Sequence, residues 1–302
     1  MKLVLNGKSS VPIWFVTSHN WSTLQRDMTP EARQFAKANG FEPVAGRMLI
    51  LPDQVKGLGG VLLGQGEPEK KSGDAFLVGK LVGALPKGLY HFANSPIGGE
   101  RALELATLSW LLSSYKYARY KSSKSEFPLL VAPKGIHASG MESIARSVAL
   151  VRDLVNTPAN DLGPEDLERS ALALCKSFKI KPQVIRGAQL LKQNFPLIHA
   201  VGRAAKQEPR LIDFSSGPAR APKVTLVGKG VCFDTGGLDI KPSSAMLMMK
   251  KDMAGAATAL GLARMIMDAK LPIRLRVILP IVENSVSSDS FVRVIFITPA
   301  RA

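Results

Sequence analysis

Four charged side chains that could act together lie in one short segment of the chain, residues 224–257. Lys229 follows an apolar run and Asp234 follows a second one, with glycines close to both. Because open parallel sheets bind ligands outside the carboxyl ends of their strands, we expect both side chains at such an edge. Lys241 comes next, and Asp252 directly precedes a run of small residues that would allow a helix to pack closely. The segment therefore predicts one site made of two lysines and two aspartates.

Three kinds of site fit these residues. A phosphate site would use the glycines and a lysine, but the P-loop spacing and a complete G-x-G-x-x-G motif are both absent. A purely structural arrangement would pair the lysines with the aspartates. A metal site would use the carboxylate oxygens, which suit magnesium, manganese or zinc, and two cations close together need bridging carboxylates. We favour the metal site because so many special residues fall within so few positions.

The two lysines would have different protonation states in a metal site. A lysine ligates a metal only as the neutral amine, which neighbouring cations favour because they penalise the ammonium form. A second lysine that keeps its proton could stabilise a developing oxyanion. Only two Cys and four His are present, which argues against an ordinary structural zinc site.

Several segments resemble one known family. Residues 228–242 (GKGVCFDTGGLDIKP) and 249–257 (MKKDMAGAA) closely resemble the signature of the leucyl aminopeptidases, the cytosol aminopeptidase family of two-metal exopeptidases. Residues 156–160 (NTPAN) resemble the start of the family's catalytic domain, and residues 282–287 resemble the stretch beyond its helix. The resemblance covers residues 110–291, whereas the first hundred residues match only in general layout.

The resemblance implies a role for each site residue. Lys229 would be the metal-binding lysine, Asp234 the carboxylate that bridges both metals, and Asp252 a further ligand. Lys241 would be the catalytic lysine that polarises the scissile carbonyl or its oxyanion. Met249 would line the pocket for the first side chain of the substrate. A core methionine fits this Met-rich segment equally well.

The implied function is metal-dependent release of N-terminal amino acids, with a leucine-like preference, from peptides with a free N-terminus. The cofactors would be two divalent metal ions, manganese or zinc, and the assembly a homo-hexamer. We expect a cytoplasmic protein, because no export signal or membrane-spanning run is evident and the two Cys indicate a reducing compartment.

The order of apolar runs predicts an α/β fold. We expect a smaller N-terminal α/β domain with a linker helix over residues 1–127, and a partial α/β/α catalytic domain with a mostly parallel sheet over residues 128–302. The expected strands are 11–16, 47–51, 60–63, 75–78, 88–92, 180–185, 197–202, 223–227 and 273–282. The expected helices are 101–120, 140–155, 165–175 and 255–268.

The net charge of +16 raises the question of a polyanion partner. The excess is spread over both halves of the chain, which argues against a basic tail or a single basic domain. The densest cluster joins Lys116, Arg119, Lys121 and Lys124 with three tyrosines. These residues could bind nucleic acid or protein without catalysis, or could be the solvated end of a helix. We regard nucleic acid as the less favoured partner.

The sequence departs from the family pattern at its end. The family's downstream Asn-Thr-Asp-Ala-Glu-Gly-Arg element, which completes the second metal site, is not in this sequence. After Phe291 the chain reads Val-Arg-Val-Ile, which results when one base is deleted from codons for the family's Arg-Pro-Gly-Asp. We therefore expect a frameshift or truncation after Phe291, a non-native 292–302, an incomplete second metal site and no appreciable peptidase activity of this chain.

Overall fold

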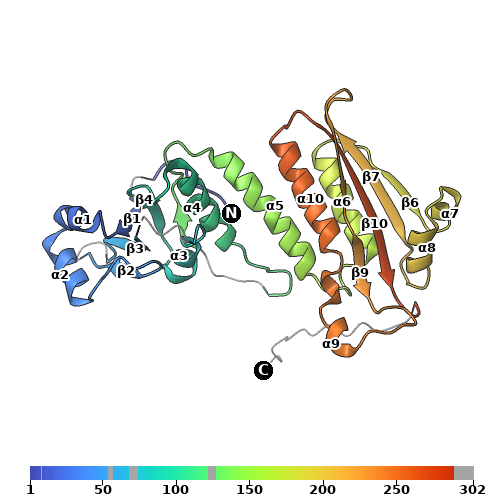
Figure 1. Ribbon diagram of the computed structural model, residues 1–302, viewed down its shortest axis with the longest axis horizontal. Coiled ribbons are helices and arrows are strands. Elements are labelled where there is room, and N and C mark those ends of the chain that lie inside the picture. The colour runs from blue at the N-terminus through green and yellow to red at the C-terminus, as the bar shows by residue number, and fades with distance from the viewer. Residues whose placement is uncertain (8, 54–56, 68–73, 122–126, 289–302) are drawn as a thin grey trace. The chain divides into compact units, whose positions relative to one another are not determined.

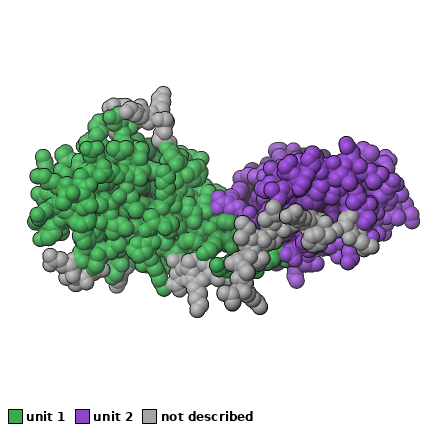
Figure 2. Space-filling view, turned by 90° about the horizontal axis from the view of Figure 1, so that it is seen from below, with its two compact units in different colours: residues 1–146 green, residues 147–302 purple. Residues whose placement is uncertain are grey.

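The computed structural model describes residues 1–302 except 8, 54–56, 68–73, 122–126 and 289–302. The expected non-native stretch 292–302 lies outside the described residues. Contacts divide the chain into two compact units, residues 1–146 and 147–302, each described by itself (Figure 2). Both units contain a sheet and helices, so the predicted α/β class is confirmed. The domain boundary predicted near residue 127 stays a prediction.

The first unit contains a five-stranded sheet in the order β2-β3-β1-β4-β5. Its strands are β1 (Val11–Thr17), β2 (Met48–Leu51), β3 (Gly60–Gly66), β4 (Leu89–Phe92) and β5 (Leu129–Leu130). Its helices are α1 (Trp21–Asp27), α2 (Pro30–Ala38), α3 (Gly79–Ala84) and α4 (Gly99–Ser113), and α5 (Ala138–Asn156) begins here. Every pairing is parallel except that between β2 and β3.

Both faces of this sheet are covered, because side chains alternate between them along each strand. Ile13 and Phe15 of β1 pack into one core together with Trp110 of α4. The alternate residues Trp14 and Val16 pack into a second core on the opposite face, together with Ala32 and Ala36 of α2. Because both sets of alternating side chains are packed in a core, the sequence of β1 is a nearly continuous apolar run.

Two expectations for this unit are wrong. Residues 75–78 form turns and not a strand, because the Phe76 N–H bonds to the Asp74 carboxylate at 2.9 Å and fixes a local turn. The helix expected over 101–120 ends at Ser113, where the Ser114 hydroxyl donates to the Trp110 carbonyl at 2.9 Å. The described part of the basic and tyrosine-rich cluster, residues 115–121, therefore follows the helix as irregular chain.

The second unit is built on a long central strand, β10 (Arg274–Asn284). Its other strands are β6 (Gln183–Arg186), β7 (Arg210–Ser216), β8 (Lys223–Val227) and β9 (Gly230–Asp234). Strand β10 is parallel to β8 and β9 along one side and antiparallel to β7 along the other, and β7 is antiparallel to β6. The sheet is therefore mixed, with its parallel part on the side that carries the predicted site.

Helices cover both faces of the second sheet (Figure 1). On one face the second half of α5, α6 (Pro164–Ser177) and α10 (Ala254–Asp268) pack in the larger core. On the other lie α7 (Gln189–Lys192) and α8 (Pro196–Gly202) over a smaller core centred on Leu190 and Leu211. Residues 197–202 were expected as a strand but form α8, because Pro196 at the first helical position initiates a helix without needing an N–H.

A buried ion pair links α6 to the sheet. Glu168 and Arg210 are 5% and 3% exposed, and Arg210 Nη1 lies 2.7 Å from Glu168 Oε2. Arg186 also donates to this carboxylate, through Nε at 3.1 Å and through Nη2. Burial alone would raise the pKa of Glu168, but the hydrogen bonds from Arg186 and Arg210 outweigh it, so the pKa lies below its ordinary value. The carboxylate is thus charged and paired in the folded unit.

Replacing Glu168 by Gln should lower the free energy of unfolding by about 3 kcal/mol, because Arg210 would keep a buried charge without its carboxylate. Glu165→Gln is the matched control, since Glu165 is 57% exposed and lies 3.7 Å from Arg210, and it should cost below about 1 kcal/mol. Urea unfolding of the two variants measures both effects.

The stabilisation by Glu168 should also depend on pH. A carboxyl whose pKa is lowered in the folded state stabilises the fold above its unfolded pKa, and this contribution is lost as the pH falls through its folded pKa. The difference between wild type and Glu168→Gln should therefore be full at neutral pH and shrink below about pH 4, and equal costs for both variants would contradict this assignment.

Candidate active site

Lys229 lies at an interruption of an edge strand. Val227 at the end of β8 pairs with Ile278, and Gly230 at the start of β9 pairs with Ile281, so β8 and β9 run in one line and one register along β10. Lys229 therefore follows the carboxyl end of β8, as expected, but this position is not at the carboxyl edge of the sheet because β9 continues along β10. The interruption turns the Lys229 carbonyl away from the sheet, where it accepts a hydrogen bond from the Ala256 N–H at 2.8 Å.

Two glycines allow α10 to approach this interruption. A Cβ on Gly255 would lie 2.9 Å from the Lys229 backbone nitrogen, and a Cβ on Gly228 would lie 2.7 Å from Ala256 Cα. Real side chains do not tolerate such contacts, so the small residues in the motif serve close backbone packing. The first turn of α10 is thereby held against Lys229, and Asp252 lies two residues before that turn.

Lys229 and Asp252 form an ion pair. Lys229 Nζ donates to Asp252 Oδ1 at 2.7 Å, and the two side chains are 60% and 19% exposed. Among the described residues, no hydrogen-bond donor reaches Asp252 Oδ2, although that atom is buried. A buried carboxylate oxygen without a partner is unfavourable by about 1–3 kcal/mol, and a cation would satisfy it. The amine and this carboxylate therefore fit one divalent cation.

Asp234 ends β9 and accepts hydrogen bonds at both oxygens. Gly236 N–H donates to Oδ1 at 2.9 Å, Asn284 Nδ2 donates to Oδ1 at 2.8 Å, and Lys241 Nζ donates to Oδ2. Burial alone would raise the pKa of Asp234, but these donors outweigh it and hold the pKa below its ordinary value. The group is a carboxylate that is well ordered by its neighbours.

Asn284 is a site residue that sequence reasoning missed. It ends β10, pairs with Asp234 across the strands, and its carbonyl accepts from Thr235 N–H at 3.0 Å and from Thr235 Oγ1 at 2.9 Å. It lies 50 positions from Asp234, so no local spacing relates the two. The signal available was its place in the segment 282–287 that resembles the family.

A glycine turn brings Lys241 back to Asp234. Gly236 and Gly237 have φ values of 90° and 71°, which L side chains rarely adopt, and a Cβ on Gly236 would lie 2.2 Å from the Asp239 carbonyl. Lys241 N–H then donates to the Thr235 carbonyl at 2.9 Å. Asp239 itself is exposed. The loop therefore returns Lys241, but not Asp239, to the end of β9.

The remaining predicted residues lie close by along the chain. Met249 is the first residue of the short helix η1 (Met249–Lys251), which packs against β9, and it is half-buried. Lys250 donates to the Asn156 carbonyl at 3.2 Å, which connects the segments 249–257 and 156–160. Cys232 is buried, and burial raises the pKa of both Cys232 and Cys175, so neither is a reactive thiol.

The donor set is two aspartates and a lysine amine. Across the described part of the chain, no three His, Cys, Asp or Glu side chains are grouped to hold a metal. The third donor is the Lys229 amine beside Asp252, whereas Lys241 donates a hydrogen bond to the Asp234 carboxylate in this conformation. The arrangement can bind one cation at Lys229 and Asp252, and can bind another at Asp234 only after Lys241 releases it.

The basic cluster after α4 is partly engaged with itself. The Tyr117 and Tyr120 rings are 6.0 Å apart, and the Arg119 guanidinium lies 5.9 Å from the centre of the Tyr120 ring. Lys124 lies outside the described residues. These contacts among the described residues are equally compatible with nucleic-acid binding and with an ordinary solvent-exposed surface.

Within the described ranges, no helix is long and apolar enough to cross a membrane.

Comparison with family models identifies the chain. The N-terminal domain model of the M17 aminopeptidases matches residues 11–133, and the catalytic domain model of the cytosol aminopeptidase family matches residues 149–294. The chain belongs to the cytosol aminopeptidase family. The predicted site residues all lie within the part matched by the catalytic domain model.

Relatives of this cytosol aminopeptidase family member are similar over most of the chain. A probable cytosol aminopeptidase of Chlamydia muridarum is 34% identical over 76% of this chain and 51% of its own length. The solved structure of the cytosol aminopeptidase from Coxiella burnetii is 39% identical with a TM-score of 0.87, over 96% of this chain and 62% of that one. The bottromycin maturation enzyme BotP, solved in complex with Mn, is 25% identical with a TM-score of 0.77, over 94% of this chain and 61% of that one. The chain thus spans about half the length of the first of these relatives.

The close approach of α10 to Lys229 can be tested with Gly255→Ala. The added methyl would meet the Lys229 backbone at 2.9 Å, so we expect a loss of about 1–3 kcal/mol of unfolding free energy. Gly83→Ala is the matched control, because Gly83 is also helical and has no atom within 4 Å of an added Cβ. It should be neutral or slightly stabilising. Thermal or urea unfolding measures both, and a neutral Gly255→Ala would show that the approach is not needed.

Proposed function

We propose that the chain carries part of the active site of a metal-dependent aminopeptidase, which releases N-terminal amino acids with a leucine-like preference from peptides with a free N-terminus. The observation that supports this most directly is the buried, partnerless Oδ2 of Asp252 beside the amine of Lys229. Membership of the cytosol aminopeptidase family and the Mn complex of the relative BotP support the same conclusion.

Each residue would have a separate task. Lys229 and Asp252 would hold a manganese or zinc ion, and Asp234 would bridge to a second one. A bound divalent cation would supply electrophilic activation of the peptide carbonyl and of a water molecule. Lys241 donates a hydrogen bond to Asp234 in this structure, and it would donate to the carbonyl oxygen of the substrate as negative charge develops there. Met249 would contact the first side chain of the substrate.

The surrounding residues hold these groups in place. Asn284 and the Gly236 N–H fix the orientation of the Asp234 carboxylate. The approach of α10 fixes Asp252 relative to Lys229. Such fixed polar groups reduce the reorganisation needed when charge develops in the transition state. We further propose a homo-hexameric assembly and a cytoplasmic location, as expected for the family.

The metal assignment predicts that Asp252→Asn weakens Mn²⁺ binding at least tenfold, since a carboxamide donates poorly to a cation. Electron paramagnetic resonance of free Mn²⁺ in titrations of the purified chain measures the affinity. Asp239→Asn is the matched control, because Asp239 lies in the same segment but is exposed, and its affinity should equal that of wild type. Equal weakening by both substitutions would mean that only general negative charge attracts the ion.

The two lysines should respond in opposite ways to substitution by Met. Lys229→Met removes a ligand, so the Mn²⁺ affinity should fall several-fold. Lys241→Met removes an ammonium that occupies Asp234, so the affinity should stay the same or rise. The same titration measures both variants. A fall in affinity for Lys241→Met alone would mean that Lys241, and not Lys229, is the metal ligand.

Hydrolysis by this chain should be at background. Among the described residues, the donors brought to the site are two carboxylates and one amine, whereas two neighbouring cations need more carboxylate ligands. Release of p-nitroaniline from leucine p-nitroanilide, with Mn²⁺ or Zn²⁺ added, measures this. Turnover that disappears in Asp252→Asn would contradict the expectation and would mean that these residues suffice.

A further inference from the structure

The short helix η1 connects two residues of the candidate active site. Met249 begins η1 and Asp252 follows its last residue, and the Asp252 N–H donates to the Met249 carbonyl at 3.1 Å. Two lysines lie between them, of which Lys250 is half-buried and Lys251 is exposed. Because one turn of backbone joins Met249 to Asp252, a displacement of η1 would move the proposed metal ligand and the proposed pocket residue together.

The side chain of Lys250 extends from η1 to the carboxyl end of α5. Its Nζ lies 3.2 Å from the carbonyl oxygen of Asn156, the last residue of α5. The last four carbonyls of an α-helix have no N–H partner within the helix, and the helix dipole gives them a partial negative charge. Helix α5 is described over its whole length and has no basic residue in its last turn. Lys250, which is 94 positions away in the chain, supplies a cation there.

The end of α5 is formed by a segment that has no task in the proposed reaction, although it resembles the start of the family's catalytic domain. Pro158 disfavours the helical conformation at Thr157 and has no N–H that could continue the helix. Thr157 Oγ1 donates to the Asp153 carbonyl at 2.7 Å, and the Thr157 N–H bonds to the same carbonyl at 3.1 Å. The Asn156 carbonyl accepts from Lys250. The helix therefore ends where its last residue meets η1.

We propose that Lys250 is a positioning residue of the candidate active site, which fixes η1 to the end of α5 and so holds Asp252 and Met249 in place. This task rests on the proposed function, because it consists of placing Asp252 for a metal ion. The contact with β9 supports η1 as well, so Lys250 adds a second point of attachment.

The positioning role has an electrostatic signature of its own. Lys250 is positively charged, so the loss of its charge alone would strengthen the binding of a cation nearby. Loss of positioning would weaken that binding, because Asp252 would no longer be held in one place. The sign of the change in Mn²⁺ affinity therefore distinguishes the two effects.

Electron paramagnetic resonance of free Mn²⁺ in titrations of the purified chain measures this sign. Lys250→Met should weaken Mn²⁺ binding about fivefold, less than the roughly tenfold or more lost with a group bonded directly to a ligand. Lys250→Arg keeps a long, charged donor and should restore the wild-type affinity. Lys251→Met is the matched control, since it removes the same charge from the exposed neighbour, and its affinity should stay the same or rise. Lys250→Gln serves if Lys250→Met does not fold.

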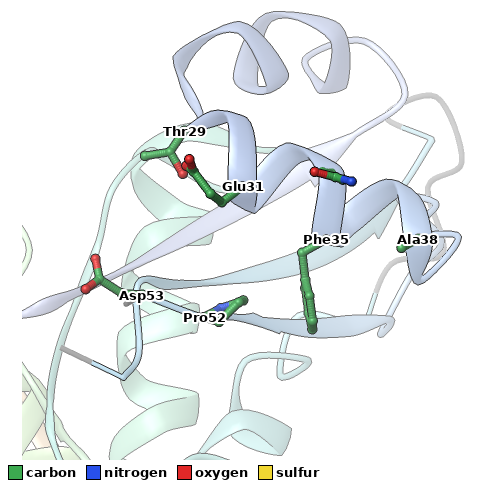
Figure 3. A pocket seen from close by; sticks show the side chains of 7 residues that line it. Thr29, Glu31, Phe35, Ala38, Pro52 and Asp53 are labelled. Atoms are coloured by element: carbon green, nitrogen blue, oxygen red, sulfur yellow. The ribbon is translucent and has the colours of Figure 1, made fainter. Parts of the chain in front are cut away.

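Two further variants show where the ion and the effect are located. In an Asp252→Asn background, Lys250→Met should cause no further loss, because no carboxylate is left for it to position. Glu31 lines a cavity of about 580 Å³ beside α2 in the first unit, where an acidic side chain could also attract Mn²⁺ (Figure 3). Glu31→Gln should leave the affinity unchanged. A loss from Lys250→Met that persists in the Asp252→Asn background would overturn the proposal.

A measurement without metal separates the role of Lys250 from the proposed function. In EDTA, hydrogen exchange of the Asp252 N–H reports whether η1 is held, because this N–H bonds to the Met249 carbonyl. Its protection factor should fall about fivefold in Lys250→Met and stay at the wild-type value in Lys250→Arg and Lys251→Met. This result without Mn²⁺ binding by the wild type would refute the proposed metal site but not the attachment of η1. Unchanged protection in Lys250→Met, or an equal loss in Lys251→Met, would overturn the attachment itself.

Discussion

The packing of α10 against the break between β8 and β9 is the constraint on which the site depends. Gly228 and Gly255 let two backbones approach to distances that no other residue allows, and the Ala256 N–H to Lys229 carbonyl bond closes the contact. This contact holds Lys229, in the strand break, close to Asp252, two residues before α10, and Lys229 Nζ lies 2.7 Å from Asp252 Oδ1. A helix start and a strand break are both rigid, so the donor pair is held by the scaffold and not by a mobile loop.

Charge balance explains the state of the site. Two lysines and two aspartates form two ion pairs, so the site is neutral as it stands. The pairs differ, because Asp234 has donors at both oxygens whereas one buried oxygen of Asp252 has no donor among the described residues. Partly buried ion pairs with vacant acceptor capacity are suited to exchange an ammonium for a metal cation. In the proposed metal site, this difference would make the Lys229 side the more ready to accept a cation.

The resemblance and the structure relate the residues of the candidate site in different ways. The resemblance named Lys229, Asp234, Lys241, Asp252 and Met249. The structure pairs Lys229 with Asp252 and Lys241 with Asp234, and it adds Asn284 as an orienting group. It also shows that the pair Glu168 and Arg210, which no motif marks, is the most buried ionic contact of the second unit among the described residues.

The sequence by itself determined the elements with strong local signals and the identity of the family. The helix at 254–268 and the strands at 223–227 and 274–284 lie within a residue or two of their expected limits, because apolar periodicity and turn residues act locally. Only the tertiary structure decided the mixed pairing of the second sheet, the position of Lys229 in the break between two edge strands, and the partner of each lysine. These depend on strand register and on contacts between residues tens of positions apart, and local propensity carries no information about either.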